Sequence, residues 1–371
     1  MRIKRAGKYV IGVVLFLILI PLCILLLTAL TPKPPEAEVE FARLSLSQAA
    51  SGDAAAYSGR LYNEARALYD SAMTNWRAEN RRFIFFRDYD KVAYFARLST
   101  EKAEKALQSS KNNASTLRIK IKQKIDSLNN LSVRINRIFK AYPLPPEIWN
   151  RISKGKMLLK ESEIAFAKGQ YLQANKMITD SESMLTSSYE KALLDLKEYF
   201  SNYQAWQTWV SKTIKESRQN QSCSIIIDKY SRKCLVYLNG IKKYEYQVEL
   251  STNWVGDKMV KGDKATPEGM YRITKKFGSN RTKYYKALLI DYPNENDRAE
   301  FKKAISKGAL PRNAKMGSLI EIHGNGGKGV DWTEGCIALA DSEMDIVFKA
   351  VREGTPVTIV GSMVDLKQVL D

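Results

Sequence analysis

The pattern of apolar and polar positions divides the chain into three stretches. Residues 9–30 are uncharged and mostly apolar, residues 41–218 have apolar positions three and four apart, and residues from 223 onward have short β-branched runs between turn residues. The spacing in residues 41–218 is typical of helices with one buried face, and the short runs from residue 223 onward are typical of strands. The sequence therefore predicts an α+β multidomain chain with an N-terminal transmembrane helix, an all-α helical bundle and a mainly β domain.

The uncharged run from Tyr9 to Leu30 predicts a membrane anchor. As a helix its 22 residues would be about 33 Å long, enough to cross a hydrocarbon core of about 30 Å. Four basic residues precede it (Arg2, Lys4, Arg5 and Lys8). Basic residues that flank a membrane-spanning helix usually lie on its cytoplasmic side. We therefore expect a cytoplasmic tail at 1–8, a single-pass anchor at 9–31 in the cytoplasmic membrane, and export of the rest to the periplasm. A cleaved signal peptide is the alternative, although its apolar region would normally be about 7–15 residues.

The next two stretches predict a linker and a helical segment. Residues 32–40 are polar and rich in proline. Apolar spacing over 41–218 predicts about five long antiparallel helices, with breaks at Asn112-Asn113, at the prolines of 143–146 and at Gly169. No catalytic set of residues stands out there. We interpret 41–218 as a spacer or interaction bundle, which leaves a protein partner open.

Residues 223–371 predict the mainly β domain. Strands are expected at 224–228, 234–238, 244–250, 270–274, 287–291, 318–323, 335–339 and 356–360, and a helix at about 342–352. A hairpin turn near Tyr230-Ser231 would place Cys234 opposite Ile227 and Cys223 opposite about Leu238. A direct disulfide between these two strands is therefore not expected.

Composition and charge narrow the chemistry. The chain has 59 Lys+Arg, 40 Asp+Glu, a net charge of +19, one histidine and four cysteines. Metal sites of the zinc type need several clustered Cys and His ligands, so no metal or cofactor is expected. The basic residues form no stripe interleaved with aromatic residues, so nucleic acid is a poor partner. A basic surface that faces an anionic polymer or a membrane fits better.

The one histidine and one of the cysteines lie at the two ends of a glycine-rich stretch, IHGNGGKGVDWTEGCIAL. His323 ends a predicted strand and Cys336 begins another, so the loop between them can bring both to one sheet edge. An imidazole within hydrogen-bond reach can activate a cysteine nucleophile. Gly335 would let backbone N–H groups approach an oxyanion, and Thr333 and Gly324 would support the turns. The alternative is a structural cysteine beside a satisfied histidine.

The pattern His-Gly, a short loop and then Thr-x-Gly-Cys-Ile-x-Leu resembles the catalytic motif of the L,D-transpeptidases, the YkuD-like family. Ile225–Gly240 resembles the opening hairpin of that family, and Lys264–Ile273 resembles its Thr-Pro-x-Gly strand. Tyr292–Arg298 is similar to a subgroup of murein-processing members. The resemblance covers about residues 223–362 and none of the helical segment.

The resemblance implies a β-rich cell-wall enzyme that acts on peptidoglycan stem peptides. Cys336 would form a thioester at the third residue of the stem and release the terminal D-Ala, with His323 as the base. Many members have Arg where this chain has Ala338, so Arg298 or Arg312 is expected to hold the substrate carboxylate instead. Asp331 and Glu334 are interpreted as surface residues first and as binders of a substrate amine second.

The sequence is compatible with three functions. We expect L,D-transpeptidase activity in cell-wall biogenesis and cell shape. Hydrolysis by the same nucleophile, as an L,D-carboxypeptidase or an amidase, is the alternative within the enzyme class. A non-catalytic wall-binding scaffold is the alternative from another class.

Overall fold

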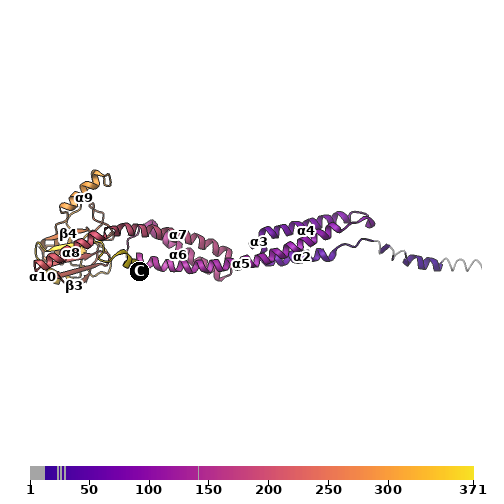
Figure 1. The fold of residues 1–371 in the computed structure, drawn as a ribbon, viewed down its shortest axis with the longest axis horizontal. Coiled ribbons are helices and arrows are strands. Elements are labelled where there is room, and N and C mark those ends of the chain that lie inside the picture. The colour runs from indigo at the N-terminus through magenta and orange to yellow at the C-terminus, as the bar shows by residue number, and fades with distance from the viewer. Residues whose placement is uncertain (1–12, 23–24, 26, 29–30, 141) are drawn as a thin grey trace, which may run out of the picture. The chain divides into compact units, whose positions relative to one another are not determined.

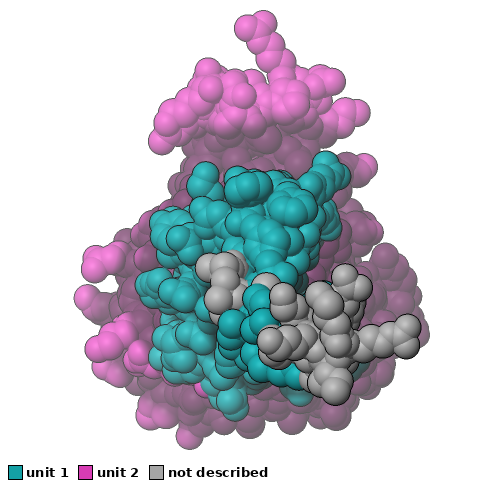
Figure 2. All heavy atoms as spheres, turned by 90° about the vertical axis from the view of Figure 1, so that its right-hand side faces the viewer, with its two compact units in different colours: residues 1–125, 162–176 teal, residues 126–161, 177–371 magenta. Residues whose placement is uncertain are grey.

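The structure is a computed structural model that describes residues 13–22, 25, 27–28, 31–140 and 142–371 (Figure 1). It confirms a helical region followed by a domain built on a curled β-sheet. The chain divides into two compact units, of which the first comprises residues 1–125 and 162–176 and the second residues 126–161 and 177–371 (Figure 2). The predicted domain boundaries at 40, 218 and 223 stay predictions.

The predicted N-terminal anchor is described only in part. The tail at 1–8 and several positions of the run at 9–31 lie outside the described residues. Among the residues that are described, no helix is both long enough and apolar enough to cross a bilayer.

The first unit is built from antiparallel helices that pack through small residues. It contains α2 (Glu36–Ser51), α3 (Ala54–Tyr57), α4 (Gly59–Asn80), η1 (Ile84–Phe86) and the first part of α5 (Asp90–Phe139). Fully buried alanines such as Ala42, Ala72 and Ala96 line the contacts between these helices. Because an alanine has no side chain beyond Cβ, the helices pack closely there.

The α5 helix corrects one sequence expectation. It runs without a break through Asn112 and Asn113. The Asn113 amide donates to the carbonyl of Tyr57, and the Asn112 side chain accepts from Gln108 on the same helix. Because these side chains have partners outside the helix backbone, they do not interrupt its hydrogen bonds. The other two expected breaks are present.

The remaining helices before the sheet are α6 (Pro146–Ala167), α7 (Tyr171–Tyr199), η2 (Phe200–Asn202) and α8 (Tyr203–Gln219). The prolines of 143–146 precede α6, and Gly169, with φ of +75°, separates α6 from α7. A glycine adopts this left-handed conformation without the steric cost that other residues carry.

The second unit contains an eight-stranded sheet in the order β3-β2-β1-β8-β4-β5-β6-β7. Its strands are β1 (Cys223–Asp228), β2 (Lys233–Leu238), β3 (Ile241–Gln247), β4 (Gly269–Phe277), β5 (Ala287–Ile290), β6 (Glu321–His323), β7 (Ile337–Ala338) and β8 (Pro356–Val360). Three helices accompany it, namely α9 (Glu295–Ser306), α10 (Asp341–Ala350) and α11 (Leu366–Leu370). The sequence pattern did not predict α9.

The first hairpin has the predicted register. Ile227 pairs with Cys234, and Cys223 pairs with Leu238. Both cysteines are free thiols in the structure.

The sheet curls because its two outermost strands meet. Just beyond β3, Glu249 forms an antiparallel bridge with Ala338 of β7, and Ser251 forms a bridge with Thr333. These bridges join the segment after β3 to the end of the sheet that carries the candidate site.

Helix α8 packs on the sheet and contacts β8 and β1. Its Trp206 is fully buried, and a side-chain carbon placed on Gly361 would lie 2.3 Å from the Trp206 ring. Any larger residue at 361 would displace that ring. The indole and the glycine therefore fit together as one packing unit.

A buried ion pair joins the helices to the sheet domain. Lys229 Nζ lies 2.8 Å from Glu268 Oε1, and both side chains are almost fully buried. The Glu268 carboxylate also accepts from the Tyr199 hydroxyl at 2.7 Å and from Trp206 Nε1 at 3.0 Å. Lys229 donates further to two backbone carbonyls, those of Gly256 and Thr266. The network satisfies both charges, which removes much of the penalty of burying them.

Replacing Glu268 with alanine is expected to destabilise the second unit strongly. The change leaves the Lys229 ammonium buried without its counter-ion, which typically costs about 3–5 kcal/mol. The measurement is thermal unfolding followed by near-ultraviolet circular dichroism. Glu245→Ala is the control, because Glu245 pairs with Lys233 and Lys242 at the surface. Equal melting temperatures for the two variants would contradict the expectation.

Candidate active site

The parallel pairing of β6 and β7 places the two candidate catalytic residues on neighbouring segments at one edge of the sheet. Ile322 pairs with Ile337, and His323 pairs with Ala338. Side chains alternate between the two faces of a sheet, so Cys336, two residues before Ala338, shares a face with Ala338 and with His323. The structure thus places His323 and Cys336 at diagonal positions on neighbouring chain segments.

The His323 ring is fixed in one orientation and one tautomer. Its Nδ1 lies 2.6 Å from the carbonyl oxygen of Gly324, and a carbonyl can only accept, so the proton is on Nδ1. The ring stacks on Tyr284 with centroids 3.6 Å apart and meets the edge of Trp332 at 5.9 Å. Nε2 is buried and has no hydrogen-bond partner among the described residues. Its lone pair is therefore available to take a proton.

Burial lowers the pKa of His323 to about 4. The hydrogen bond to Gly324 opposes this change, and the ammonium groups of Lys283 and Lys328 add to it. The imidazole is consequently neutral at pH 7, and it becomes protonated only when the pH falls to about 4.

Cys336 is partly exposed and is also uncharged at neutral pH. Burial raises the pKa of its thiol above the ordinary value of 9.0, while the backbone N–H of Glu321 and the nearby Lys283 and Lys258 lower it in part. The Cys336 Sγ lies 3.8 Å from the carbonyl oxygen of Leu319. At rest the thiol and the imidazole are therefore both neutral.

The three supporting residues named from the sequence lie at the same place. The Thr333 hydroxyl donates to the Cys336 carbonyl at 2.7 Å and accepts a long bond of 3.4 Å from the Gly335 N–H. Gly335 has φ of +123°, and a Cβ there would lie 2.6 Å from the carbonyl oxygen of Ala265. A Cβ on Gly324 would lie 2.7 Å from Asp341 Oδ1. Both turns thus need glycine for space, and Gly335 also needs it for conformation.

Neither candidate arginine is joined to the described residues of this site by a recorded side-chain hydrogen bond or ion pair. Arg298 on α9 and Arg312 in the segment after α9 are exposed. Their substrate-binding role stays a prediction. Ala338, which replaces the arginine of many family members, is fully buried against the bridge to Glu249.

Asp331, expected at the surface, is partly exposed and also has a structural role. Its carboxylate accepts from Arg232 Nη2 at 2.7 Å and Nε at 3.0 Å, and from the Leu250 N–H at 2.9 Å. These bonds tie the glycine-rich loop to the turn of the first hairpin. Glu334 is exposed, as expected.

Glu249 holds the glycine-rich loop and was missed by the sequence reading. Its backbone exchanges two hydrogen bonds of 2.9 Å with Ala338. Its nearly buried carboxylate accepts from the Gly329 N–H and from Trp332 Nε1, each at 2.6 Å. Because Trp332 contacts the His323 ring, Glu249 positions the base indirectly. No local sequence signal marks this residue.

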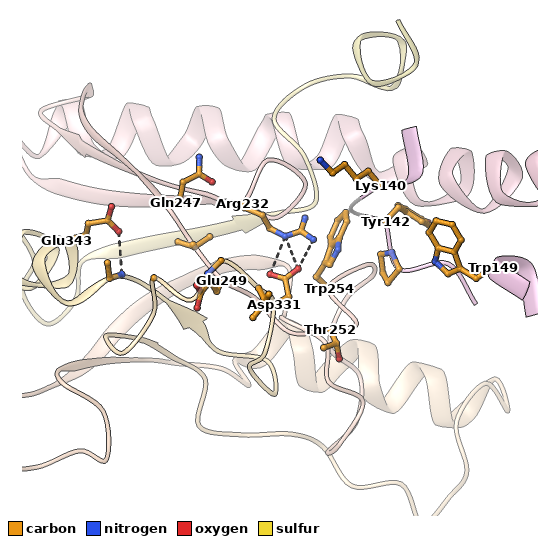
Figure 3. Close-up of a pocket in the computed structure, with 16 residues that line it drawn as sticks. Lys140, Tyr142, Trp149, Arg232, Gln247, Glu249, Thr252, Trp254, Asp331 and Glu343 are labelled. Atoms are coloured by element: carbon orange, nitrogen blue, oxygen red, sulfur yellow. Dashed lines mark hydrogen bonds and ion pairs between the residues drawn. The ribbon is translucent and has the colours of Figure 1, made fainter. Parts of the chain in front are cut away.

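A groove of about 720 Å³ borders the same loop (Figure 3). Glu249, Asp331 and Trp254 line it, together with Tyr142 from the connection between α5 and α6 and Trp149 from the start of α6. Arg232 reaches across to Asp331 in this view. Neither Cys336 nor His323 lines the groove, so it adjoins the catalytic loop without containing the candidate nucleophile.

Within the described part of the chain, no group of three or more His, Cys, Asp or Glu side chains is arranged to hold a metal ion.

Comparison with known proteins agrees with this geometry. Residues 224–359 match the family model of the L,D-transpeptidase catalytic domain, YkuD. This C-terminal domain therefore belongs to the L,D-transpeptidase catalytic-domain family. The chain is 27% identical over 148 residues to YafK of Escherichia coli strain K12, a protein named for L,D-transpeptidase activity, and the match covers 39% of this chain. It spans 53% of YafK, so the chain covers about half the length of the curated relatives it matches.

Two solved structures are also similar to this chain. Bd1075 of Bdellovibrio bacteriovorus is 22% identical with a TM-score of 0.31, and the match covers 41% of this chain and 53% of Bd1075. The helical cell shape determining protein Pgp2 of Campylobacter jejuni is 23% identical with a TM-score of 0.31, and the match covers 43% of this chain and 56% of Pgp2.

Replacing Glu249 with glutamine is expected to loosen the glycine-rich loop. The neutral amide has one acceptor oxygen and turns its NH₂ group toward one of the two donors, so one hydrogen bond to a charged group is lost, about 1.5–3 kcal/mol. Amide hydrogen exchange in residues 326–332 should become faster. Glu334→Gln, an exposed change in the same loop, is the matched control and should leave exchange unchanged. Unchanged exchange in Glu249→Gln would show that the carboxylate does not hold the loop.

The neutral thiol predicts a particular pH profile for alkylation of Cys336. Only the thiolate reacts, so the rate with iodoacetamide should rise about tenfold per pH unit from about pH 7 to pH 9. Peptide mapping separates Cys336 from Cys223, whose pKa burial raises to about 11. A preformed thiolate–imidazolium pair would instead give a rate that is flat over this range and falls in His323→Ala. That result would contradict the neutral pair.

Proposed function

We propose that this chain is a cell-wall enzyme, an L,D-transpeptidase that acts on peptidoglycan stem peptides through a Cys336 thioester. One observation carries the proposal: His323 Nε2 is a buried and unpartnered base on the face shared with Cys336, while Nδ1 is fixed by Gly324. Membership of the catalytic-domain family supports the substrate class.

In the first half of the reaction, Cys336 Sγ attacks the carbonyl of the third stem residue while Nε2 takes the thiol proton. The tetrahedral intermediate then collapses as the imidazolium gives that proton to the leaving amine. The C–N bond breaks, D-Ala leaves, and a thioester remains on Cys336. The neutral resting pair suits this sequence, because the proton moves only when the substrate carbonyl is present.

In the second half, the amine of another stem peptide attacks the thioester and His323 accepts its proton. A new amide bond forms, the C–S bond breaks and the proton returns to the thiolate sulfur. Water in place of the amine would give hydrolysis, which is the reaction of an L,D-carboxypeptidase. An amidase that detaches wall-linked peptides would use the same thioester.

The proposal also includes the location of the enzyme. The anchor predicted at 9–31 would hold the chain in the cytoplasmic membrane with its N-terminus inside and its catalytic domain in the periplasm. The helices of 41–218 would act as a spacer or bind a protein partner there. The composition of the run and the basic residues before it support this arrangement.

Digestion of purified peptidoglycan followed by mass analysis of the stem peptides tests the reaction. New 3–3 crosslinks would support transfer, free tripeptides would favour hydrolysis, and no change would favour a non-catalytic scaffold. Cys336→Ala should abolish the change, and His323→Ala should reduce its rate by about 10²–10⁴. Cys223→Ala is the control, since this thiol lies at the start of β1 and should be dispensable. Activity within threefold of wild type in either site variant would contradict the assignment.

A further inference from the structure

Four consecutive large apolar side chains are exposed in the loop between α4 and α5. Phe83 and Phe86 are 66% and 68% exposed, and Ile84 and Phe85 are 40% and 38% exposed. The Phe83 ring lies 5.7 Å from that of Phe85 and 6.0 Å from that of Phe86, so the aromatic rings pack mainly on one another. We name residues 83–86 the aromatic tip. A continuous exposed apolar patch of this kind usually marks a binding surface.

The loop that carries the aromatic tip is held in place. The Phe86 N–H donates to the Phe83 carbonyl at 2.8 Å, and the Asp88 N–H donates to Glu79 Oε2 at 2.9 Å. The Arg87 guanidinium donates to the carbonyls of Arg82 and Asn80, each at 3.2 Å. The rings are thus presented outward by a bonded loop instead of folding back onto the helices.

The aromatic tip lies at the end of the first unit where the chain enters from the predicted anchor. Val39, near the start of α2, packs with Ala72, Tyr89 and Val92 from the end of α4 and the start of α5. The opposite end holds the turn after α2, where Ser110 donates to the Gly52 carbonyl. Figure 1 shows the loop beyond the end of α4.

The distance along the chain is also short. Residues 31–35 separate the uncharged run from α2, and five extended residues reach at most about 17 Å. A bilayer that held the run would therefore lie close to the aromatic tip.

Three arginines flank the aromatic tip, namely Arg81, Arg82 and Arg87, and of these Arg82 forms an ion pair with Glu79 at 2.8 Å. Aromatic rings beside basic side chains are typical of segments that lie at the interface of a membrane with anionic lipids. A stable protein interface needs about 800 Å² from each partner, much more than four side chains on a loop provide. A bilayer has no such requirement, because each ring that enters it contributes its own favourable free energy of transfer from water.

We propose that the aromatic tip inserts into the headgroup region of a bilayer containing anionic lipids, the same membrane that holds the anchor. The proposed anchor and the proline-rich linker by themselves do not set the direction of the first unit from the membrane, whereas a second contact would set it. This inference uses the proposed anchor to orient the unit and does not depend on the chemistry at Cys336.

Limited trypsin digestion of the full chain in vesicles tests this inference. The chain is inserted into preformed vesicles of phosphatidylcholine, with or without phosphatidylglycerol, and also kept in detergent. Cleavage after Arg81, Arg82 and Arg87 should be at least about tenfold slower in the anionic vesicles than in detergent, because the inserted rings cover these sites and Arg81 and Arg87 gain attraction to the anionic surface. Cleavage after the exposed Arg312 provides the reference rate. Amide hydrogen exchange of residues 81–89 is a second measurement that needs no variant.

Matched variants separate the aromatic tip from a general effect of the membrane. Phe83→Ser with Phe86→Ser should restore cleavage in anionic vesicles to the detergent rate. Ile119→Ser, which changes a 56% exposed side chain on α5, should keep the protection. Loss of protection in both variants would overturn the inference.

The remaining outcomes distinguish the proposals. If the chain floats with the vesicles but its loop arginines are cleaved at the detergent rate, the aromatic tip does not bind lipid and the anchor stands. If the chain does not float with either kind of vesicle, both the anchor and the tip are wrong. Protection without lipid that increases with protein concentration would show that a second copy of the chain covers the tip.

Discussion

The candidate site depends on the register in which β6 and β7 pair. A shift of one residue would move Cys336 to the face opposite His323, because side chains alternate along a strand. Several bonds fix this register besides the short ladder itself: the Leu339 N–H donates to the His323 carbonyl at 2.8 Å, and the Gly326 N–H donates to the Leu339 carbonyl at 2.8 Å. The two bonds between Glu249 and Ala338 hold β7 from its other side. A two-residue strand is thus placed by the sheet that closes around it.

The same burial acts on both members of the pair in opposite directions. It lowers the pKa of the imidazole and raises that of the thiol, since each charged form would lose hydration. A thiolate–imidazolium ion pair in the resting enzyme is therefore disfavoured by the burial of each of the two groups. The orientation of the base comes from a backbone carbonyl, which supplies no charge and leaves Nε2 free for the proton. Such an arrangement needs no acidic third residue.

Sequence reasoning succeeded where the signal was local. Short β-branched runs and the expected turn near Tyr230-Ser231 predicted the strands and the register of the first hairpin, and the pairing of Ile227 with Cys234 confirms this register. It failed where the contact that determines a residue's role joins residues far apart in the sequence. Glu249 reaches Trp332 over 83 residues, and Tyr284 stacks on His323 over 39, so neither has a neighbour in sequence that could reveal its role. The break expected at Asn112-Asn113 failed because the contact with Tyr57 satisfies the amide outside the helix.

The helices that precede the sheet are part of how the sheet domain is held together. Glu268 occupies the variable position of the Thr-Pro-x-Gly stretch, and its carboxylate takes donors from α7 and α8 as well as from Lys229. A carboxylate at that position needs those donors, because Lys229 alone leaves acceptor sites of a buried charge unsatisfied. A fragment beginning at residue 219 would lose the Tyr199 and Trp206 donors and would uncover the strands under α8. The sheet and the helices that supply these groups therefore form one energetic unit, whatever further role the rest of the helical segment has.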